Sequence, residues 1–408
     1  MFSSATFLSL LLLTVSTAEA RMNASPIQRD PGQGANPVLA VASRVAALGT
    51  KNLLQLDLQR VASLVHNASG KRAGNAPVSN SGVVFDANVT VGIPGAQYTL
   101  LVDTGSSNTW VGSRKSHPYK LTGDAKKTGE NVTVTYGSGQ FTGYEVTDTF
   151  SLGSGIVIAS QSIGVATSAT GFDDVDGILG DSIGPSDLTK GTLDNAKDEI
   201  PTVLDGLKTG GSIPDEVLGI YYAPSAGMPQ GELSFGAVDM SKTTGAVNYV
   251  PITASSPAST YWGIDQSITY GGKPILATGS GIIDTVGMFA AAFGAYQNAT
   301  GGKMDQATGL LKITPAQFSA LQPLNFQIGS QTYPLIPDAQ IWPRSLNSAI
   351  GGSGDGIYLV LQSLGGSGNG MDFINGFSFL QRFYSVFDTT KHQVGFATTA
   401  STDVTTNY

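Results

Sequence analysis

From Gly82 onward the sequence alternates short apolar runs with turn-forming residues, and this pattern limits the fold more than any other feature. The runs are rich in β-branched and aromatic residues, and Gly, Ser, Asn or Asp separates them, as in β-strands joined by turns. Gly accounts for 52 of 408 residues and charged residues for 13%, which favours a turn-rich all-β protein. The expected strands are 83–85, 98–102, 132–136, 157–158, 162–165, 249–252, 261–270, 281–283, 326–328, 357–361, 383–387 and 394–396.

Four segments have helical periodicity instead. In the body of the chain they are 198–208 and 314–321, the second with Thr314 as its N-cap. Upstream, apolar residues recur at helical spacing over 38–48 and again over 54–65. The sequence therefore predicts a few short helices beside many strands.

The first 20 residues have the layout of a secretion signal. Residues 7–15 form a short apolar core, and Ala18-Glu19-Ala20 is a small-residue cleavage pattern. No apolar run approaches the roughly 18 residues that a transmembrane helix needs. We therefore expect a secreted, extracellular protein with residues 1–20 removed and no membrane attachment.

Charge is distributed unevenly after this signal. Residues 21–72 carry seven basic and two acidic residues, a net +5, whereas the chain from Ala73 onward carries 15 basic and 27 acidic residues, a net −12. A basic segment attracts an acidic body at neutral pH, and the attraction fades when carboxylates are protonated. Lys71-Arg72 has the form of a dibasic processing site. Residues 21–72 are therefore predicted to be a basic pro-segment that inhibits the body in the same molecule.

Composition excludes several other chemistries. The chain has no cysteine, so disulfides, iron–sulfur clusters and a cysteine nucleophile are excluded. The three histidines, His66, His117 and His392, lack ligand spacing, so we expect no metal and no cofactor. A net charge of −8 argues against nucleic acid as a partner.

A weak internal repeat places two aspartates in similar surroundings. Leu101-Val102-Asp103-Thr104-Gly105 has a counterpart in Ile282-Ile283-Asp284-Thr285-Val286, 181 positions later. Two similar β lobes, each with one Asp at the end of a buried strand, explain such a repeat. We expect an N-terminal lobe over 73–244 with the first Asp and a C-terminal lobe over 245–408 with the second.

These two aspartates predict a hydrolytic site. An Asp at a strand end is usually a turn former, but a pseudo-equivalent pair can meet between the lobes. Two carboxylates about 3 Å apart cannot both ionise and hold one proton between them. The ionised member takes a proton from water and the protonated one donates to a carbonyl, with neither Asp assigned a fixed protonation state.

Several motifs in fixed order resemble one known family. They are Asp103–Trp110 as the first active-site loop, Tyr136–Gly139 as a flap, Asp176–Gly180, Gly231–Gly236, Phe379–Asp388 and Val394–Ala397. Together they resemble the pepsin-like aspartic endopeptidases, in particular the secreted basidiomycete polyporopepsin-type enzymes, over nearly all of 82–398. The resemblance implies an all-β, bilobal pepsin-like double β-barrel with an active-site cleft between the lobes.

The resemblance also implies a role for each matching residue. Asp103 and Asp284 are the implied catalytic pair, acting on an extended polypeptide, and the protein is expected to be a monomer. Thr104 and Thr285 are implied to cross-bond under the pair, and Gly105 to let the backbone approach the carboxylates. Ser106 is implied to hydrogen-bond Asp103, and Trp110 to pair with the Tyr136 hydroxyl. The implied flap over the substrate is Tyr136, Gly137, Ser138 and Gly139.

One departure from the family pattern concerns the second loop. Asp284-Thr285 is followed by Val286 where the family has Gly, and about four residues are missing thereafter. A β-branched residue there could strain the backbone by ~1–3 kcal/mol and displace the pair. The alternatives are a gene-model error, a tolerated variant loop, or a non-catalytic pseudoprotease that binds peptides or proteins.

The main prediction is a secreted aspartic endopeptidase, made as a zymogen, that hydrolyses peptide bonds at acidic pH with a water activated between Asp103 and Asp284. Besides the pseudoprotease, a two-carboxylate glycosidase is a rival, although aromatic sugar platforms are scarce near either Asp. Three Asn-X-Ser/Thr sites in the body are candidate glycan acceptors, which are Asn88, Asn131 and Asn298.

Overall fold

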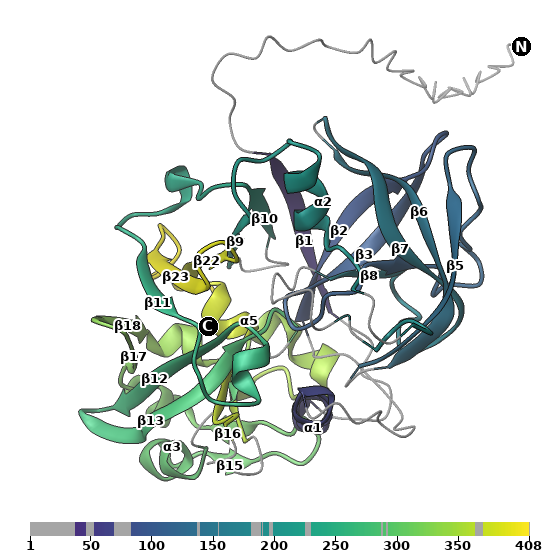
Figure 1. The fold of residues 1–408 in the computed structure, drawn as a ribbon. Helices are drawn as coiled ribbons and strands as arrows, with labels where there is room; N and C mark the ends of the chain where they lie inside the picture. The colour runs from purple at the N-terminus through teal and green to yellow at the C-terminus, as the bar shows by residue number, and fades with distance from the viewer. Residues whose placement is uncertain are drawn as a thin grey trace, which may run out of the picture. The chain divides into compact units, whose positions relative to one another are not determined.

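The computed structural model describes residues 37–45, 53–68, 83–136, 139–153, 155–180, 189, 191–195, 199–224, 230–286, 289–290, 293–363 and 370–407. These residues lie in one compact unit, Asn36–Tyr408. They form many strands and a few short helices, so the all-β prediction is confirmed (Figure 1). The predicted signal, residues 1–20, lies outside the described residues.

The N-terminal strands form one end of a 13-stranded sheet with the order β11-β23-β22-β9-β10-β1-β2-β3-β8-β4-β7-β6-β5. Two predicted strands, 157–158 and 162–165, are parts of the single long strand β7, which pairs with β6 along most of its length. The bounds are β2 Val83–Val91, β3 Ala96–Asp103, β4 Trp110–Val111, β5 Lys126–Thr135, β6 Gln140–Gly153, β7 Ile156–Thr170 and β8 Gly177–Gly180.

The other end of this sheet joins strands from both halves of the chain. β9 pairs with β22, for example Ile220 with Ser385, so the sheet crosses the predicted lobe boundary at 244/245. The C-terminal motifs form the paired strands β22 and β23. The bounds are β1 Val38–Val45, β9 Val217–Ala223, β10 Gln230–Phe235, β11 Asn248–Pro251, β22 Phe383–Asp388 and β23 Gln393–Thr398.

The helix predicted over 38–48 is wrong, because Val38–Val45 forms the strand β1. β1 lies between β10 and β2 and pairs antiparallel with both. Leu39 and Val41 are buried while Ala40 and Ala42 are exposed, which is the period of a strand. Two open strand edges offer backbone hydrogen bonds that outweigh the local helical spacing.

The C-terminal strands form a 7-stranded sheet with the order β18-β17-β12-β13-β21-β14-β20 and a 3-stranded sheet with the order β15-β16-β19. Within the first, β13 is parallel to β21, β21 antiparallel to β14, and β14 parallel to β20. The N-terminal run β3-β8-β4-β7 has the same order and directions. The internal repeat therefore corresponds to two equivalent strand arrangements, blue and green in Figure 1.

The bounds of these strands match the predicted runs only in part, because residues 273–280 and five of the strands (289–290, 303–304, 311–313, 331–335 and 373–375) were not predicted. They are β12 Gly263–Tyr270, β13 Lys273–Ile283, β14 Phe289–Ala290, β15 Lys303–Met304, β16 Leu311–Ile313, β17 Leu324–Ile328, β18 Gln331–Leu335, β19 Ile357–Leu359, β20 Leu361–Gln362 and β21 Phe373–Asn375.

Helices are short except for α1, Leu53–Ala68, which confirms the second upstream helix. α4, Pro315–Ser319, has a capping box with Thr314, as predicted. The helix predicted over 198–208 is α2, Val203–Thr209, and it begins late because Thr202 caps it after Pro201. The remaining helices are α3 Phe293–Thr300, α5 Phe377–Leu380 and the 3₁₀ turns 240–242, 258–260, 337–340 and 344–350. In the described part of the chain, no helix is long and apolar enough to cross a membrane.

One acidic side chain is enclosed in the N-terminal strands. Glu145 on β6 is 2% exposed, and its Oε1 accepts a hydrogen bond from the Ser162 hydroxyl at 2.8 Å. Its Oε2 has no hydrogen-bond partner among the described residues. Burial raises the pKa of Glu145 to about 8, although the Ser162 bond opposes this. Between pH 4.5 and about 8 the folded protein therefore holds a proton on Glu145 that the unfolded chain releases.

This buried carboxyl is expected to make stability fall with rising pH. Because the folded pKa lies above the ordinary value of 4.5, the stabilising effect is complete below that value and is lost as pH rises through about 8. Glu145→Gln keeps the neutral form at every pH and should raise the melting temperature by several degrees at pH 8 relative to wild type, but not at about pH 4.5.

The melting curves are best compared in an Asp103→Asn background, because the hydrolytic site that the sequence predicts would otherwise cut the chain. Thr147→Ser, on the same strand β6, changes no ionisable group, so it is the control and should show no such pH trend. A shift of equal size at both pH values would contradict the assignment to Glu145 ionisation.

Candidate active site

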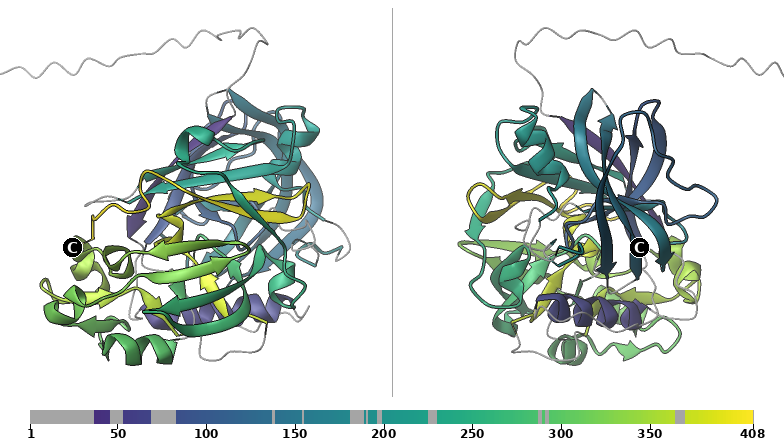
Figure 2. Two further views of the ribbon diagram at one scale, coloured as in Figure 1. Left: turned by 90° about the vertical axis from the view of Figure 1, so that its left-hand side faces the viewer. Right: turned by 45° about the vertical axis from the view of Figure 1, so that its right-hand side comes forward.

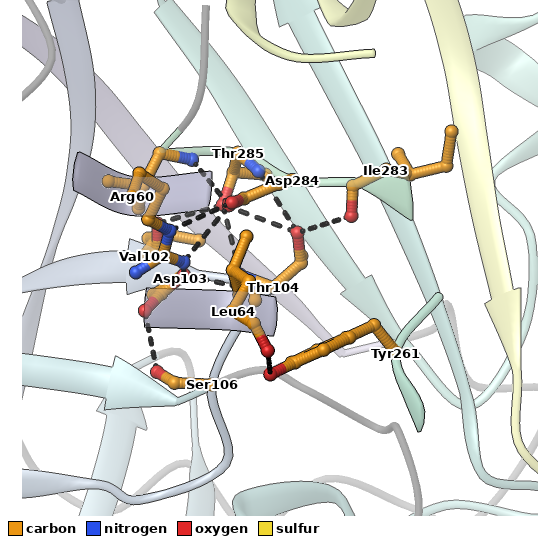
Figure 3. Close-up of polar contacts among 12 residues, drawn as sticks. Arg60, Leu64, Val102, Asp103, Thr104, Ser106, Tyr261, Ile283, Asp284 and Thr285 are labelled. Atoms are coloured by element: carbon orange, nitrogen blue, oxygen red, sulfur yellow. Dashed lines mark hydrogen bonds and ion pairs between the residues drawn. The ribbon is translucent and has the colours of Figure 1, made fainter. Parts of the chain in front are cut away.

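Asp103 and Asp284 face each other at the ends of two equivalent strands. Asp103 is the last residue of β3 and Asp284 directly follows β13, and both are fully buried. Beneath them Thr104 and Thr285 each donate the backbone N–H to the other's hydroxyl, both at 3.0 Å (Figure 3). The Thr285 hydroxyl also donates to the Val102 carbonyl at 3.0 Å. The cross-bonding places the two strand ends, and so the two carboxyl groups, side by side.

Asp103 is held by its own loop. Its Oδ1 accepts the Gly105 N–H at 2.9 Å, and its Oδ2 accepts the Ser106 hydroxyl at 2.5 Å. A Cβ at Gly105 would lie 3.1 Å from the Asp284 Cγ, so glycine leaves the second carboxyl group uncrowded. Burial raises the pKa of Asp103, and the neighbouring Asp284 raises it further, while Arg60 and the Ser106 bond lower it.

Asp284 keeps the equivalent backbone contact despite the unusual second loop. The Val286 N–H donates to Asp284 Oδ1 at 3.0 Å, matching the bond from Gly105 to Asp103. The displacement of the pair that the missing glycine suggested is therefore not seen. Residues 287–288, at the predicted deletion, lie outside the described residues.

A cation that the sequence analysis did not identify joins the two aspartates. Arg60 lies on α1, within the predicted pro-segment, and is 6% exposed. Its Nη2 donates to Asp103 Oδ1 at 2.6 Å and to Asp284 Oδ1 at 3.2 Å, and its Nε donates to Asp284 Oδ2 at 2.9 Å (Figure 3). Burial lowers the pKa of Arg60, but the two carboxylates outweigh this and raise it. In the sequence, the feature that points to Arg60 is a single Arg or Lys among the apolar positions of an amphipathic helix.

Apolar contacts hold α1 beside the pair. Val61 and Leu64 are buried in a cluster with Tyr261 and Ile282 of the C-terminal half, near β12 and β13. The Tyr261 hydroxyl donates to the Leu64 carbonyl at 2.8 Å. Two views show α1, in purple, next to the green C-terminal strands (Figure 2). The helix therefore fills the space above both carboxylates.

The predicted flap is described only in part. Tyr136 is buried against Phe172, with ring centroids 5.4 Å apart, and Trp110 lies 6.4 Å away. Within the described residues neither the Tyr136 hydroxyl nor the Trp110 Nε1 makes a hydrogen bond of regular geometry. Burial raises the pKa of Tyr136, and Trp110 opposes this as a side-chain hydrogen-bond partner, so the pairing through the hydroxyl stays a prediction. A Cβ at Gly139 would lie 2.1 Å from the Thr170 carbonyl oxygen, which requires glycine. Gly137 and Ser138 lie outside the described residues.

The three candidate glycan acceptors lie at the surface, whereas the aspartate pair is buried. Asn88, Asn131 and Asn298 are exposed, and the Asn131 amide donates to Asp194 at 2.8 Å. Among the described residues no three His, Asp or Glu side chains converge as metal ligands. The site therefore consists of the aspartate pair, its two loops, the flap tyrosine and the guanidinium of α1.

Two buried aspartates, each at the end of an equivalent strand and joined through cross-bonded threonines, define a bilobal pepsin-like aspartic protease. The family model "Eukaryotic aspartyl protease" matches residues 85–399, and the chain belongs to this family of peptide hydrolases. The family model begins after the helix that carries Arg60.

Individual relatives agree with this assignment. Polyporopepsin from Irpex lacteus is 52% identical over 344 residues, covering 82% of this chain and all of that protein. Rhizopuspepsin-1 from Rhizopus niveus is 30% identical over 309 residues, covering 71% of this chain and 76% of that protein. The crystal structure of the aspartic proteinase from Irpex lacteus superposes with a TM-score of 0.78 at 46% identity, covering 91% of this chain and all of that one.

Proposed function

We propose that this chain is the secreted zymogen of an acid-acting aspartic endopeptidase. Residues 1–20 direct secretion, 21–72 are the inhibitory pro-segment, and 73–244 and 245–408 form the two lobes. The observation that carries the proposal is the guanidinium of Arg60, which bonds both carboxylates at once. A group held there excludes both a water molecule and a substrate carbonyl from the pair.

The mechanism follows from the geometry of the pair once Arg60 has left. Asp103 and Asp284 then share one proton, because two adjacent carboxylates do not both ionise in acid. The ionised member removes a proton from water, which attacks the scissile carbonyl carbon, and the protonated member donates to the carbonyl oxygen. The aspartate that took the water proton then donates it to the amide nitrogen and the C–N bond breaks. A hydroxyl proton of the tetrahedral intermediate returns to the other aspartate, which restores the singly protonated pair. The N–H groups of Gly105 and Val286 keep both carboxyls oriented throughout.

Acid supplies the trigger in this proposal. Burial and the charge of Asp284 raise the pKa of Asp103, so this carboxyl gains a proton more readily than an exposed one. Protonation removes one anionic partner of Arg60 and weakens the attachment of α1. It also brings the pair to the singly protonated state that hydrolysis needs.

The substrate is an extended polypeptide that passes over the pair beneath Tyr136, and the enzyme acts as a monomer. Exposed Asn88, Asn131 and Asn298 are glycan acceptors in the secreted form, since glycosylation requires an accessible Asn-X-Ser/Thr site.

Acid activation tests the proposal directly. The chain from Arg21 is purified at pH 7, shifted to about pH 4, and followed by mass spectrometry for loss of the pro-segment and by cleavage of an unfolded protein. We expect both to appear together, and only after acidification. A folded chain that cleaves nothing under these conditions would overturn the proposal and favour a peptide-binding role.

A further inference from the structure

The two aspartate loops are structural counterparts that differ at one position. Gly105 and Val286 each lie two residues after their Asp, and each donates its N–H to that Asp, at 2.9 and 3.0 Å. The strands around them have the same order and directions. The two loops therefore differ in the side chain beside the pair, which is a hydrogen atom at Gly105 and an isopropyl group at Val286.

The glycine side of the pair has room only because no side chain is present. A Cβ at Gly105 would lie 2.3 Å from Nη2 of Arg60, so the inhibitory guanidinium occupies the space that a side chain would take. A substrate backbone can use that space after Arg60 leaves.

On the other loop, the Val286 side chain fills the space beside the pair. Val286 is 3% exposed and belongs to the apolar cluster that contains Tyr136, Trp110 and Phe172. Its side chain thus joins the second aspartate loop to the N-terminal apolar cluster of which the flap tyrosine is a member. An extended substrate that crosses both carboxylates meets an open backbone on one side and a branched apolar side chain on the other.

We propose that Val286 limits the size of the substrate side chain accepted beside Tyr136, next to the bond that is cut. This inference rests on the proposed endopeptidase function. A small or medium apolar residue fits against the isopropyl group, whereas a large aromatic residue at that position must displace it. Val286 is therefore a specificity-determining residue on one side of the scissile bond.

The test compares Val286→Ala and Val286→Gly with wild type, using two variants because the larger deletion could impair folding. Acid-treated full-length chains cleave a peptide series in which one residue flanking the cut site, on either side, is Ala, Leu, Phe or Trp. The kcat/KM ratio of Trp to Ala should rise about tenfold or more on one side of the bond only. Val84→Ala is the matched control, because Val84 lies in the same cluster but on β2.

An unchanged ratio, or an equal rise in Val84→Ala, would overturn the proposal. Peptides whose scissile amide is replaced by a secondary alcohol bind without being cut, and calorimetry with the same residue series separates the two hypotheses. Binding with the expected size shift but no cleavage by wild type would refute the endopeptidase function and keep Val286 as the size limit. Cleavage without a size shift would refute the role of Val286 and support the endopeptidase function. If the chain neither binds nor cleaves the peptides, both hypotheses are refuted.

Discussion

Replacing Asp103 by Asn is expected to lower kcat/KM for peptide cleavage by roughly 10⁴-fold, because general acid–base catalysis by the pair is lost. The asparagine side chain has nearly the same shape, and its oxygen can still accept the Gly105 N–H that now bonds Asp103 Oδ1. It cannot share a proton with Asp284 or release one. Initial rates on a fluorogenic peptide after acid treatment measure the loss, and a melting curve verifies the fold.

A buried aspartate outside the pair provides the control. Asp148 on β6 is 1% exposed and accepts hydrogen bonds from the hydroxyls of Tyr119 and Thr122. Asp148→Asn should keep the activity within about threefold of wild type, since it touches neither carboxyl of the pair. Asp284→Asn should lose as much as Asp103→Asn, and the double variant little more, because the two act as a unit. More than a tenth of the wild-type rate in either single variant would contradict the assignment.

The strands were predictable where the local pattern and the tertiary surroundings agree. Runs such as 98–102 and 383–387 are apolar, β-branched or aromatic, and buried between neighbouring strands. Segment 38–48 was predicted to be a helix because its spacing fits one, whereas its position between β2 and β10 is decided by residues far away in the chain. Strand pairing of this kind is a long-range property that a local window does not contain.

The aspartate pair and its threonines were predictable because the repeat places them in two similar short motifs. Arg60 was not, because its contacts with the pair span 43 and 224 positions and depend on how α1 attaches to the body. The effect of Val286 on the pair was also misjudged. The sequence shows the missing glycine, but the preserved N–H bond to Asp284 depends on a backbone path that only the structure reveals.

Arg60→Ala should activate the precursor without acid treatment. The substitution leaves two buried carboxylates facing each other without their cation, and breaking a buried ion pair from one side costs about 3–5 kcal/mol. The equilibrium for attachment of α1 should therefore shift by about 10²–10⁴-fold toward release. Arg60→Lys keeps the charge but cannot reach both carboxylates with one planar group, so an intermediate effect is expected.

The expected result is an initial peptide-cleavage rate at about pH 5.5, before any acid step, at least roughly 100-fold above that of the wild-type precursor. Hydrogen exchange of the α1 amides, measured in the Asp103→Asn background to prevent cleavage, should accelerate with Arg60→Ala in parallel. Ala62→Gln, at an exposed position of α1, is the control and should change neither quantity. If the Arg60→Ala precursor stays as inactive as wild type while α1 exchanges at the wild-type rate, Arg60 does not hold the helix on the site. If α1 is released and activity still does not appear, inhibition depends on more than the occupation of the aspartate pair.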